Sequence, residues 1–124
     1  MKTQIIDIHK IHGQRPAFDV YIGRAVRYTE FTQNSIWYNP YYAKDYSLEH
    51  IQQCLLDYEI YIKGKINKDP KRYNLNNLVG KVLACWCVNT SEIEPLRCHG
   101  QILLKLIREA EMGSPPHARG DQCD

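Results

Sequence analysis

The chain has 124 residues, of which 44% are hydrophobic and 24% are charged, and its formal net charge is +2 at pH 7. These values are typical of one globular domain, and they argue against a chain that is mostly disordered, collagen-like or highly charged. The weak positive charge does not by itself indicate a nucleic-acid-binding protein. No run of about 18 apolar residues is present and the first residues lack the apolar segment of a signal peptide, so we expect a cytoplasmic protein without a membrane span.

The first part of the chain predicts two strands and an aromatic loop. Residues 4–11 alternate in part between apolar and polar side chains, which is typical of a strand, and a turn with glycine and proline follows. Residues 18–22 form a β-branched and aromatic run that stops at Gly23, and this pattern predicts the second strand. Residues 24–45 have no sustained period, and the tyrosines around Pro40 favour an ordered aromatic loop.

Ser47 predicts the start of a helix, because its hydroxyl can accept a backbone N–H and Glu49 favours the positive end of the helix dipole. Apolar residues then recur at spacings of three and four along one face: Leu48, Ile51, Leu55, Tyr58 and Ile62. We expect this helix to end near Gly64 and a polar loop to occupy residues 65–72. One further helical turn, closed by a glycine, is expected within residues 75–80.

A buried strand and a second helix are predicted in the last part of the chain. Residues 82–87 form a small, apolar and uncharged run, which is typical of a strand buried on both faces. A polar loop follows, and Cys98 then begins a helix. Its apolar face is expected to carry Ile102, Leu103, Leu106, Ile107 and Ala110. Residues 113–124 have too few apolar side chains to offset the entropy of ordering, and they predict a disordered tail.

This order of elements predicts a small single α/β domain over residues 1–112, with a short, mostly parallel sheet flanked by helices. The strands at residues 20–22 and 82–87 are expected to be neighbours in that sheet. In such sheets ligands bind at the carboxyl ends of the strands, where loops meet helix N-termini. Candidate site residues follow both strands and begin the last helix, so we expect a ligand site at this edge.

Cysteine and histidine residues cluster near the end of the buried strand. Cys85 and Cys87 occupy alternate strand positions and therefore face the same side, and a returning loop can bring Cys98 and His99 to that side. Three thiolates and one imidazole form a Cys₃His set, which suits zinc. The alternative is that the cysteines are small buried hydrophobic residues.

A second interpretation of the same cluster needs no metal. Cys98 at a helix N-terminus gains thiolate character from the helix dipole, so Cys98 and His99 are candidate catalytic residues. The backbone amides around Gly100 are candidates for holding an oxyanion or a phosphate. The alternative for Gly100 is that it only relieves crowding in a capping turn.

Two basic regions are further candidates. Gly23 at a strand end lets the backbone approach a ligand, and Arg24 offers a two-pronged donor for phosphate or carboxylate, although it could equally be a surface ion-pair partner. The run from Lys63 to Arg72, with tyrosines at its borders, is a candidate nucleic-acid contact. Asp69 interrupts this run, and a solvated loop is the favoured interpretation.

Four blocks of the sequence, in this order, resemble one family. They are VYIGR at residues 20–24, WYNP at residues 37–40, GKVLACWC at residues 80–87 and CHG at residues 98–100, with Leu103 and Leu104 following. The chain resembles, over residues 5–111, the bacterial, phage and large-DNA-virus family catalogued as domain of unknown function 4326. Tyr41 stands where the family usually has phenylalanine, and the link between Cys87 and Cys98 is longer than the family's short link. The resemblance implies a fold and a site location rather than a reaction.

We therefore predict a protein that binds a nucleotide-like or other anionic small molecule, and turnover of that ligand is left open. Arg24 would contact the anion, Asn39 a polar group of the ligand, and the cysteine and histidine cluster would supply a thiolate or metal centre. One alternative is a non-enzymatic interaction module with a structural zinc on Cys85, Cys87, Cys98 and His99. A weaker alternative is a nucleic-acid accessory protein that uses residues 63–72. Whether the protein is an enzyme stays open, and the richness in Ile, Asn, Lys and Tyr favours a viral source.

Overall fold

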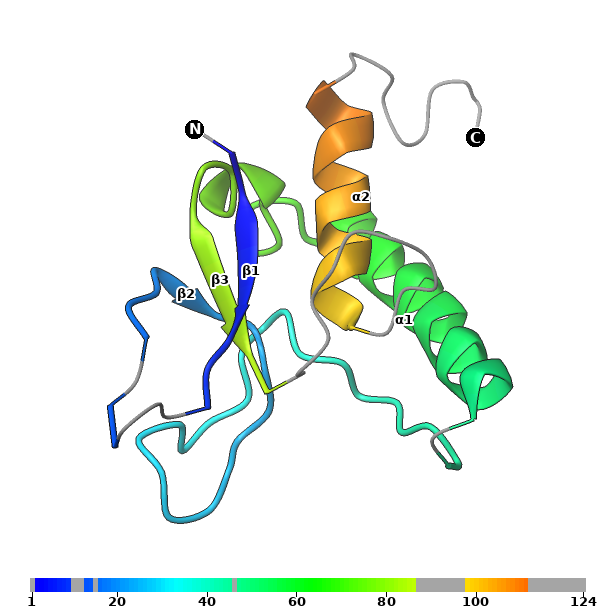
Figure 1. Cartoon of the computed structure of the whole chain (residues 1–124). Coiled ribbons are helices and arrows are strands. Elements are labelled where there is room, and N and C mark those ends of the chain that lie inside the picture. The colour runs from blue at the N-terminus through cyan, green and yellow to red at the C-terminus, as the bar shows by residue number, and fades with distance from the viewer. Residues whose placement is uncertain (1, 10–12, 15, 46, 87–97, 112–124) are drawn as a thin grey trace.

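A computed structural model describes residues 2–9, 13–14, 16–45, 47–86 and 98–111. The elements in chain order are the strands β1 (Gln4–Asp7) and β2 (Val20–Tyr21), the helix α1 (Leu48–Lys68), the 3₁₀ helix η1 (Leu75–Asn77), the strand β3 (Val82–Cys85) and the helix α2 (His99–Glu111) (Figure 1). Within these ranges no helix combines the length and the apolar character needed to cross a membrane. The tail predicted for residues 113–124 lies outside the described residues.

The three strands form one parallel sheet in the order β1–β3–β2, with β3 in the centre. Hydrogen bonds from Asp19 N to Val82 O and from Ile22 N to Ala84 O extend the pairing of β2 beyond its two residues. The prediction of a small α/β domain with a parallel sheet is confirmed, and so is the neighbouring position of β2 and β3. Because all strands are parallel, their carboxyl ends meet at one edge of the sheet.

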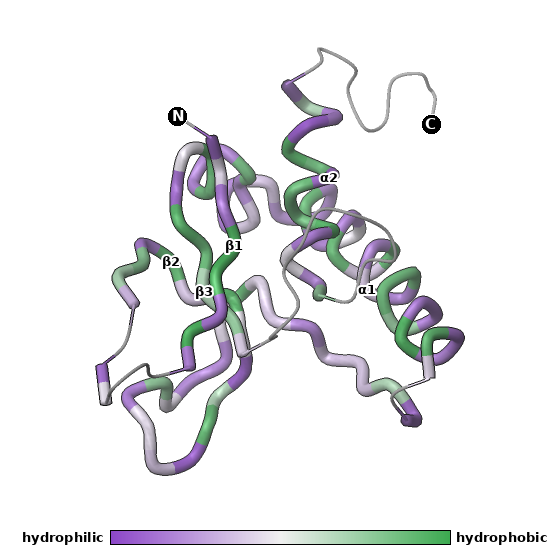
Figure 2. The backbone as a smooth tube through the Cα atoms, in the orientation of Figure 1, coloured by the Kyte–Doolittle hydropathy of each residue, from purple (hydrophilic) through white to green (hydrophobic). Residues whose placement is uncertain are grey.

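Strand alternation divides the apolar side chains between two cores. On one face Ile22, Leu83 and Cys85 pack against α1 and α2, and both helices lie on this side of the sheet (Figure 1). On the other face Ala84 packs with Phe31 and with other apolar and aromatic side chains: Ile6, Ile8, Phe18, Tyr21 and Trp86. Figure 2 shows the apolar segments along the strands and the alternating polar and apolar segments along both helices. Residues of β3 are thus buried on both faces, as predicted.

β1 is shorter than the strand predicted for residues 4–11. It ends at Asp7, whose carboxylate accepts the backbone N–H of His9 at 3.0 Å and lies 2.5 Å from Nδ1 of the same histidine. The N–H of Ile8 still donates to the Cys85 carbonyl at 2.8 Å, so the pairing with β3 reaches one residue beyond β1 before the Asp7 side chain takes up the N–H of His9. Residues 10–12 lie outside the described residues.

α1 begins as predicted, since the Ser47 side chain accepts the N–H of His50, but it continues to Lys68 instead of ending near Gly64. The predicted loop over residues 65–72 is therefore helical in its first half. Ile66 packs against the larger core, and its burial offsets the roughly 1 kcal/mol that glycine costs inside a helix. Tertiary packing therefore outweighs the tendency of Gly64 to end the helix.

α2 begins one residue after the predicted start, with Cys98 as the capping residue. The Gln101 side chain accepts the N–H of Cys98 at 2.7 Å, and the N–H of Gln101 donates to the Cys98 carbonyl at 2.9 Å. Four of the predicted face residues are buried: Ile102, Leu103, Leu106 and Ile107. Ala110 is exposed, contrary to the prediction, because the last turn of α2 projects beyond the sheet (Figure 1).

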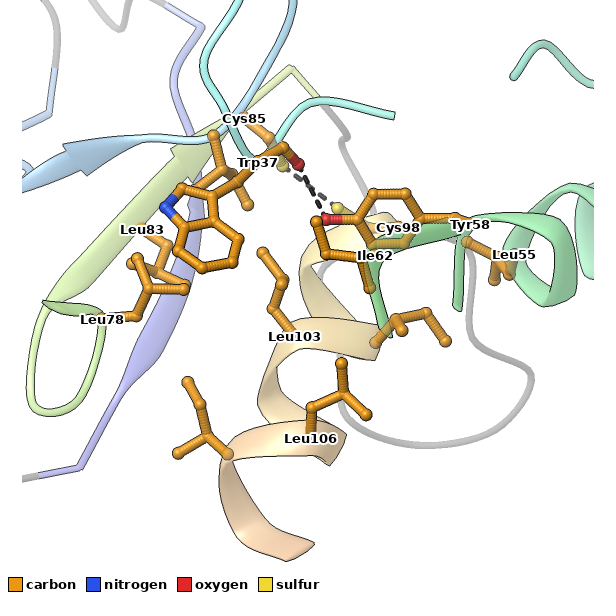
Figure 3. Close-up of a cluster of buried hydrophobic side chains, with 13 residues drawn as sticks. Trp37, Leu55, Tyr58, Ile62, Leu78, Leu83, Cys85, Cys98, Leu103 and Leu106 are labelled. Carbon is orange, nitrogen blue, oxygen red and sulfur yellow. Dashed lines mark hydrogen bonds between the residues drawn. The ribbon is translucent and has the colours of Figure 1, made fainter. Parts of the chain in front are cut away.

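Tyr58 is the largest side chain with no exposed surface, and it carries a polar group into the core. Its hydroxyl donates to the carbonyl of Trp37 at 2.8 Å (Figure 3). Burial raises the pKa of Tyr58 well above its ordinary value, because the phenolate would lose its hydration. The folded protein therefore holds this side chain as the neutral phenol.

We expect the change Tyr58→Phe to lower the free energy of unfolding at pH 7 by about 1–2 kcal/mol, since the Trp37 carbonyl loses its donor. A folded pKa above the unfolded value stabilises the native state below pH 10, and this contribution declines above about pH 10, where the unfolded phenol ionises. The difference in the free energy of unfolding between wild type and Tyr58→Phe should therefore be smaller at pH 10.5 than at pH 7, as measured by urea unfolding. The fully exposed Tyr28→Phe is the control, and a constant difference at all pH values would contradict the prediction.

Candidate functional site

An open pocket of about 990 Å³ lies at the carboxyl ends of β2 and β3. Its walls come from the loop after β2, the loop that precedes α1, one face of α1, the end of β3 and the start of α2. The structure places five of the predicted site residues in the lining: Gly23, Arg24, Asn39, Cys85 and His99. Residues that are up to 76 positions apart in the sequence thus meet at the edge of the sheet where ligands commonly bind.

Arg24 organises the loop that forms one wall of the pocket. Its Nε donates to the carbonyl of Asn39 at 2.7 Å, and an Nη donates to the carbonyl of Tyr41. The guanidinium carbon lies 3.6 Å from the centre of the Tyr42 ring. No carboxylate of the described residues lies within ion-pair distance of Arg24, so its positive charge is not neutralised by such a pair. These contacts show Arg24 bound to backbone carbonyls and to an aromatic ring, and not in the surface ion pair that was the alternative.

Asn39 makes the turn that gives this wall its shape. Its side chain is 8% exposed, its Oδ1 accepts the N–H of Tyr41 at 2.9 Å, and its Nδ2 lies 3.5 Å from the sulfur of Cys54 on α1. Together with the bond from Arg24, these contacts fasten the loop both to β2 and to α1. The role of Asn39 as a direct ligand contact stays a prediction.

The sulfur atoms of Cys85 and Cys98 lie 3.1 Å apart, at hydrogen-bonding distance (Figure 3). Cys85 is 1% exposed and lines the pocket, whereas Cys98 has no exposed surface and is not among the lining residues. The predicted nucleophile Cys98 thus lies behind Cys85. Among the cysteines that the structure describes, Cys54 and Cys85 are lining residues of the pocket.

His99 is held by the backbone of the strand edge. Its Nε2 lies 2.7 Å from the carbonyl oxygen of Ile22, and its ring meets that of Tyr58 edge-on at 5.2 Å between centroids. A carbonyl only accepts, so Nε2 carries a proton, and in the neutral ring the lone pair is on Nδ1. His99 is 8% exposed and lines the pocket. It can therefore accept a hydrogen bond or a proton from a ligand.

The predicted zinc site is described only in part, because Cys87 lies outside the described residues. The sulfurs of Cys85 and Cys98 converge, while Nε2 of His99 contacts a backbone carbonyl. Within the described ranges, no group of three histidine, cysteine, aspartate or glutamate side chains is arranged to hold a metal ion. The four-ligand zinc site stays a prediction.

Gly100 packs α2 against the sheet. A Cβ at this position would lie 2.9 Å from the terminal methyl groups of both Ile5 and Ile22, and Gly100 is not among the pocket residues. Its own N–H points to the sulfur of Cys98 at 3.4 Å, and the next amide is also bonded within the turn. The structure shows close packing at Gly100, and an anion contact at its amide stays a prediction.

The rim of the pocket carries one further cation, Lys44, next to the ion pair of Asp45 and His50. Hydrogen bonds from the side chain of Ser47 and from His50 lower the pKa of Asp45 to about 2, and the bond to Asp45 raises the pKa of His50. Asp45 is thus committed to the start of α1. The described lining thus carries two cations, Arg24 and Lys44, and one carboxylate, Asp45, which is paired with His50.

Sequence reasoning did not identify Lys44, Cys54 or Trp86 as site residues. Trp86 packs in the second core, where its Nε1 donates to Tyr21 Oη at 2.7 Å. It also lines the pocket, because the strand pleat ends at Cys85 and two consecutive residues can then reach the same space. The only local signals for these residues were charge, thiol and aromatic type.

The basic run that suggested nucleic acid is divided by the structure. Its residues are split between the end of α1 and the following turn: Lys63, Lys65 and Lys68 on α1, then Lys71 and Arg72. Glu59 pairs with Lys63 at 2.9 Å and with Lys105 of α2 at 3.0 Å, so part of the positive charge is compensated. The basic residues therefore do not form one continuous loop, and nucleic-acid binding stays a prediction.

Comparison with known proteins yields one match. A family model described as Domain of unknown function (DUF4326) matches residues 6–109. No curated protein and no solved structure matches the chain.

Proposed function

Since the chain belongs to the DUF4326 family, whose description leaves the activity open, we propose from its own pocket that it binds a nucleotide-like or other anionic small molecule. The observation that carries this proposal is the combination of two cationic side chains, Arg24 and Lys44, with an aromatic wall in one pocket. The pocket lies at the carboxyl ends of parallel strands, which is where α/β proteins usually bind such ligands.

The size and the lining of the pocket agree with a ligand of this class. Its volume of about 990 Å³ lies at the upper end of the range for small-molecule sites, roughly 300–1,000 Å³. Trp86, Tyr41 and Tyr42 supply planar faces for a ring, and the cations attract a phosphate or carboxylate. Arg24 donates to backbone carbonyls that do not neutralise it, so its charge still acts on an anion in the pocket.

His99 gives the same pocket a hydrogen-bond acceptor. Because Nε2 donates to the carbonyl of Ile22, Nδ1 of the neutral ring is available to an N–H or O–H of the ligand. If the protein also turns its ligand over, His99 is the residue for proton transfer, since it is held in one orientation at the pocket wall. The zinc-module alternative depends on Cys87 and stays a prediction.

The change Lys44→Gln tests the proposal, because Lys44 lines the pocket and is exposed. We expect a nucleoside monophosphate to bind more tightly than its nucleoside or inorganic phosphate, and Lys44→Gln to weaken it by about fivefold at low salt. Isothermal titration calorimetry with the four nucleoside monophosphates, their nucleosides and phosphate measures this. The matched control is Lys71→Gln, an exposed lysine outside the pocket. Absence of binding by every probe, or equal losses in both variants, would refute the proposal.

A further inference from the structure

The thiol pair of Cys85 and Cys98 joins two elements that are separate in the sequence. Cys85 is the last residue of the central strand, and Cys98 precedes the first turn of α2. The two residues are 13 positions apart, and their side chains point toward one another in the core (Figure 3). Two thiols at this distance can be oxidised to a disulfide, a reaction that the proposed ligand binding does not involve.

The geometry requires little movement for a covalent bond. The two sulfurs are 3.1 Å apart, and a disulfide has a sulfur–sulfur distance of about 2.05 Å, so a closure of about 1 Å is sufficient. Both side chains already face each other. We propose that Cys85 and Cys98 are an oxidation site that forms a reversible disulfide with a peroxide as oxidant.

The surroundings of the pair assign a role to each sulfur. Cys85 is among the lining residues of the pocket and Cys98 is not, so the pocket is the proposed route of a small peroxide to Cys85. Cys98 precedes the first turn of α2 and has no exposed surface, and its sulfur accepts the N–H of Gly100 at 3.4 Å. Cys85 is therefore the residue that is oxidised first, and Cys98 is the resolving thiol.

The reaction balances with one peroxide. The Cys85 thiolate attacks hydrogen peroxide, the O–O bond breaks, and Cys85 becomes a sulfenic acid with release of one water after proton transfer. The Cys98 thiolate then attacks the Cys85 sulfur, the S–O bond breaks, and a second water leaves. Two thiols and one hydrogen peroxide thus give one disulfide and two waters. A dithiol reductant reverses the oxidation.

The cross-link is expected to stabilise the fold independently of any ligand. It ties the end of β3 to the start of α2 and restricts the unfolded chain between residues 85 and 98. A closed loop of this length predicts a rise of about 10 °C in the midpoint of thermal unfolding. Dithiothreitol should remove the rise.

The experiment uses the full chain, reduced, treated with a chelator and then exposed to hydrogen peroxide. After alkylation and trypsin digestion, mass spectrometry should detect residues 82–97 joined to residues 98–105. Because residues 82–97 contain both Cys85 and Cys87, the decisive sample is Cys87→Ser, in which the cross-link and the thermal shift must persist. Cys98→Ser should lose both and show sulfenic or sulfinic acid at Cys85.

Three results would overturn the proposal. The first is a cross-link that disappears in Cys87→Ser, which assigns the bond to Cys87. The second is oxidation of Cys85 to sulfinic acid without a cross-link in the chelator-treated protein. The third is a cross-link that dithiothreitol does not remove, which excludes a reversible disulfide. Protection of all thiols from peroxide in a sample without chelator, together with bound zinc, would favour the metal over the disulfide as the native state of the pair.

Discussion

Replacing Leu103 with alanine is expected to lower the free energy of unfolding by about 3 kcal/mol. Leu103 has no exposed surface, and Figure 3 shows it at the centre of the larger core, between side chains of the sheet and of α1. The change removes most of a buried side chain and leaves a cavity, because the elements on both sides are fixed by their own packing. Domains of this size are stable by roughly 5–15 kcal/mol, so the loss is a large fraction of the total.

The matched control for this prediction is Leu56→Ala on α1. Leu56 is 56% exposed, and the same truncation there should change the free energy of unfolding by less than about 1 kcal/mol. Urea unfolding followed by circular dichroism measures both variants. Equal effects at the two positions would show that the side chain of Leu103 is not buried in the larger core.

The change Arg24→Lys is expected to lower the free energy of unfolding by about 2 kcal/mol. It should also weaken the binding of the proposed ligand more than Lys44→Gln does. The guanidinium of Arg24 donates to two carbonyls at once and stacks on Tyr42. A lysine keeps the charge but has one ammonium group, which cannot span both carbonyls or stack as a plane. The loop before α1 should therefore lose its fixed shape although the charge of the pocket is unchanged.

Arg27→Lys is the matched control, because Arg27 is exposed in the same loop and does not line the pocket. The free energy of unfolding of Arg27→Lys should equal that of the wild type within about 0.5 kcal/mol. Thermal and urea unfolding separate the two effects at Arg24, since they report loop anchoring without any ligand present. If Arg24→Lys is as stable as Arg27→Lys, the contacts of Arg24 do not hold the loop.

The two pocket cations thus differ in what their variants test. Lys44 is exposed at the rim, so Lys44→Gln should affect the affinity alone. Arg24 is part of the architecture, so its variant should affect both stability and affinity. A loss of affinity that appears only with Arg24→Lys would indicate that the ligand depends on the shape of the loop more than on local charge.

Sequence periods determined the elements and the faces of this fold. The spacing of Leu55, Tyr58 and Ile62 predicted the buried face of α1, and the continuous apolar run of residues 82–87 predicted a strand buried on both faces. These patterns are reliable because a helix repeats every 3.6 residues and a strand every two. The parallel sheet then placed the ends of β2 and β3 at one edge, which located the pocket before its walls were known.

What only the tertiary structure decided is how the chemistry-bearing residues are used. The sequence proposed Arg24 and Asn39 as ligand contacts, and the structure shows both fastening the pocket loop. Cys98 was proposed as a nucleophile, and it lies buried behind Cys85, while Gly100 packs against the sheet. These outcomes depend on contacts between residues far apart in the chain, and no local period carries that information. The sequence by itself therefore determined where the site lies, and long-range packing determined which side chains face it.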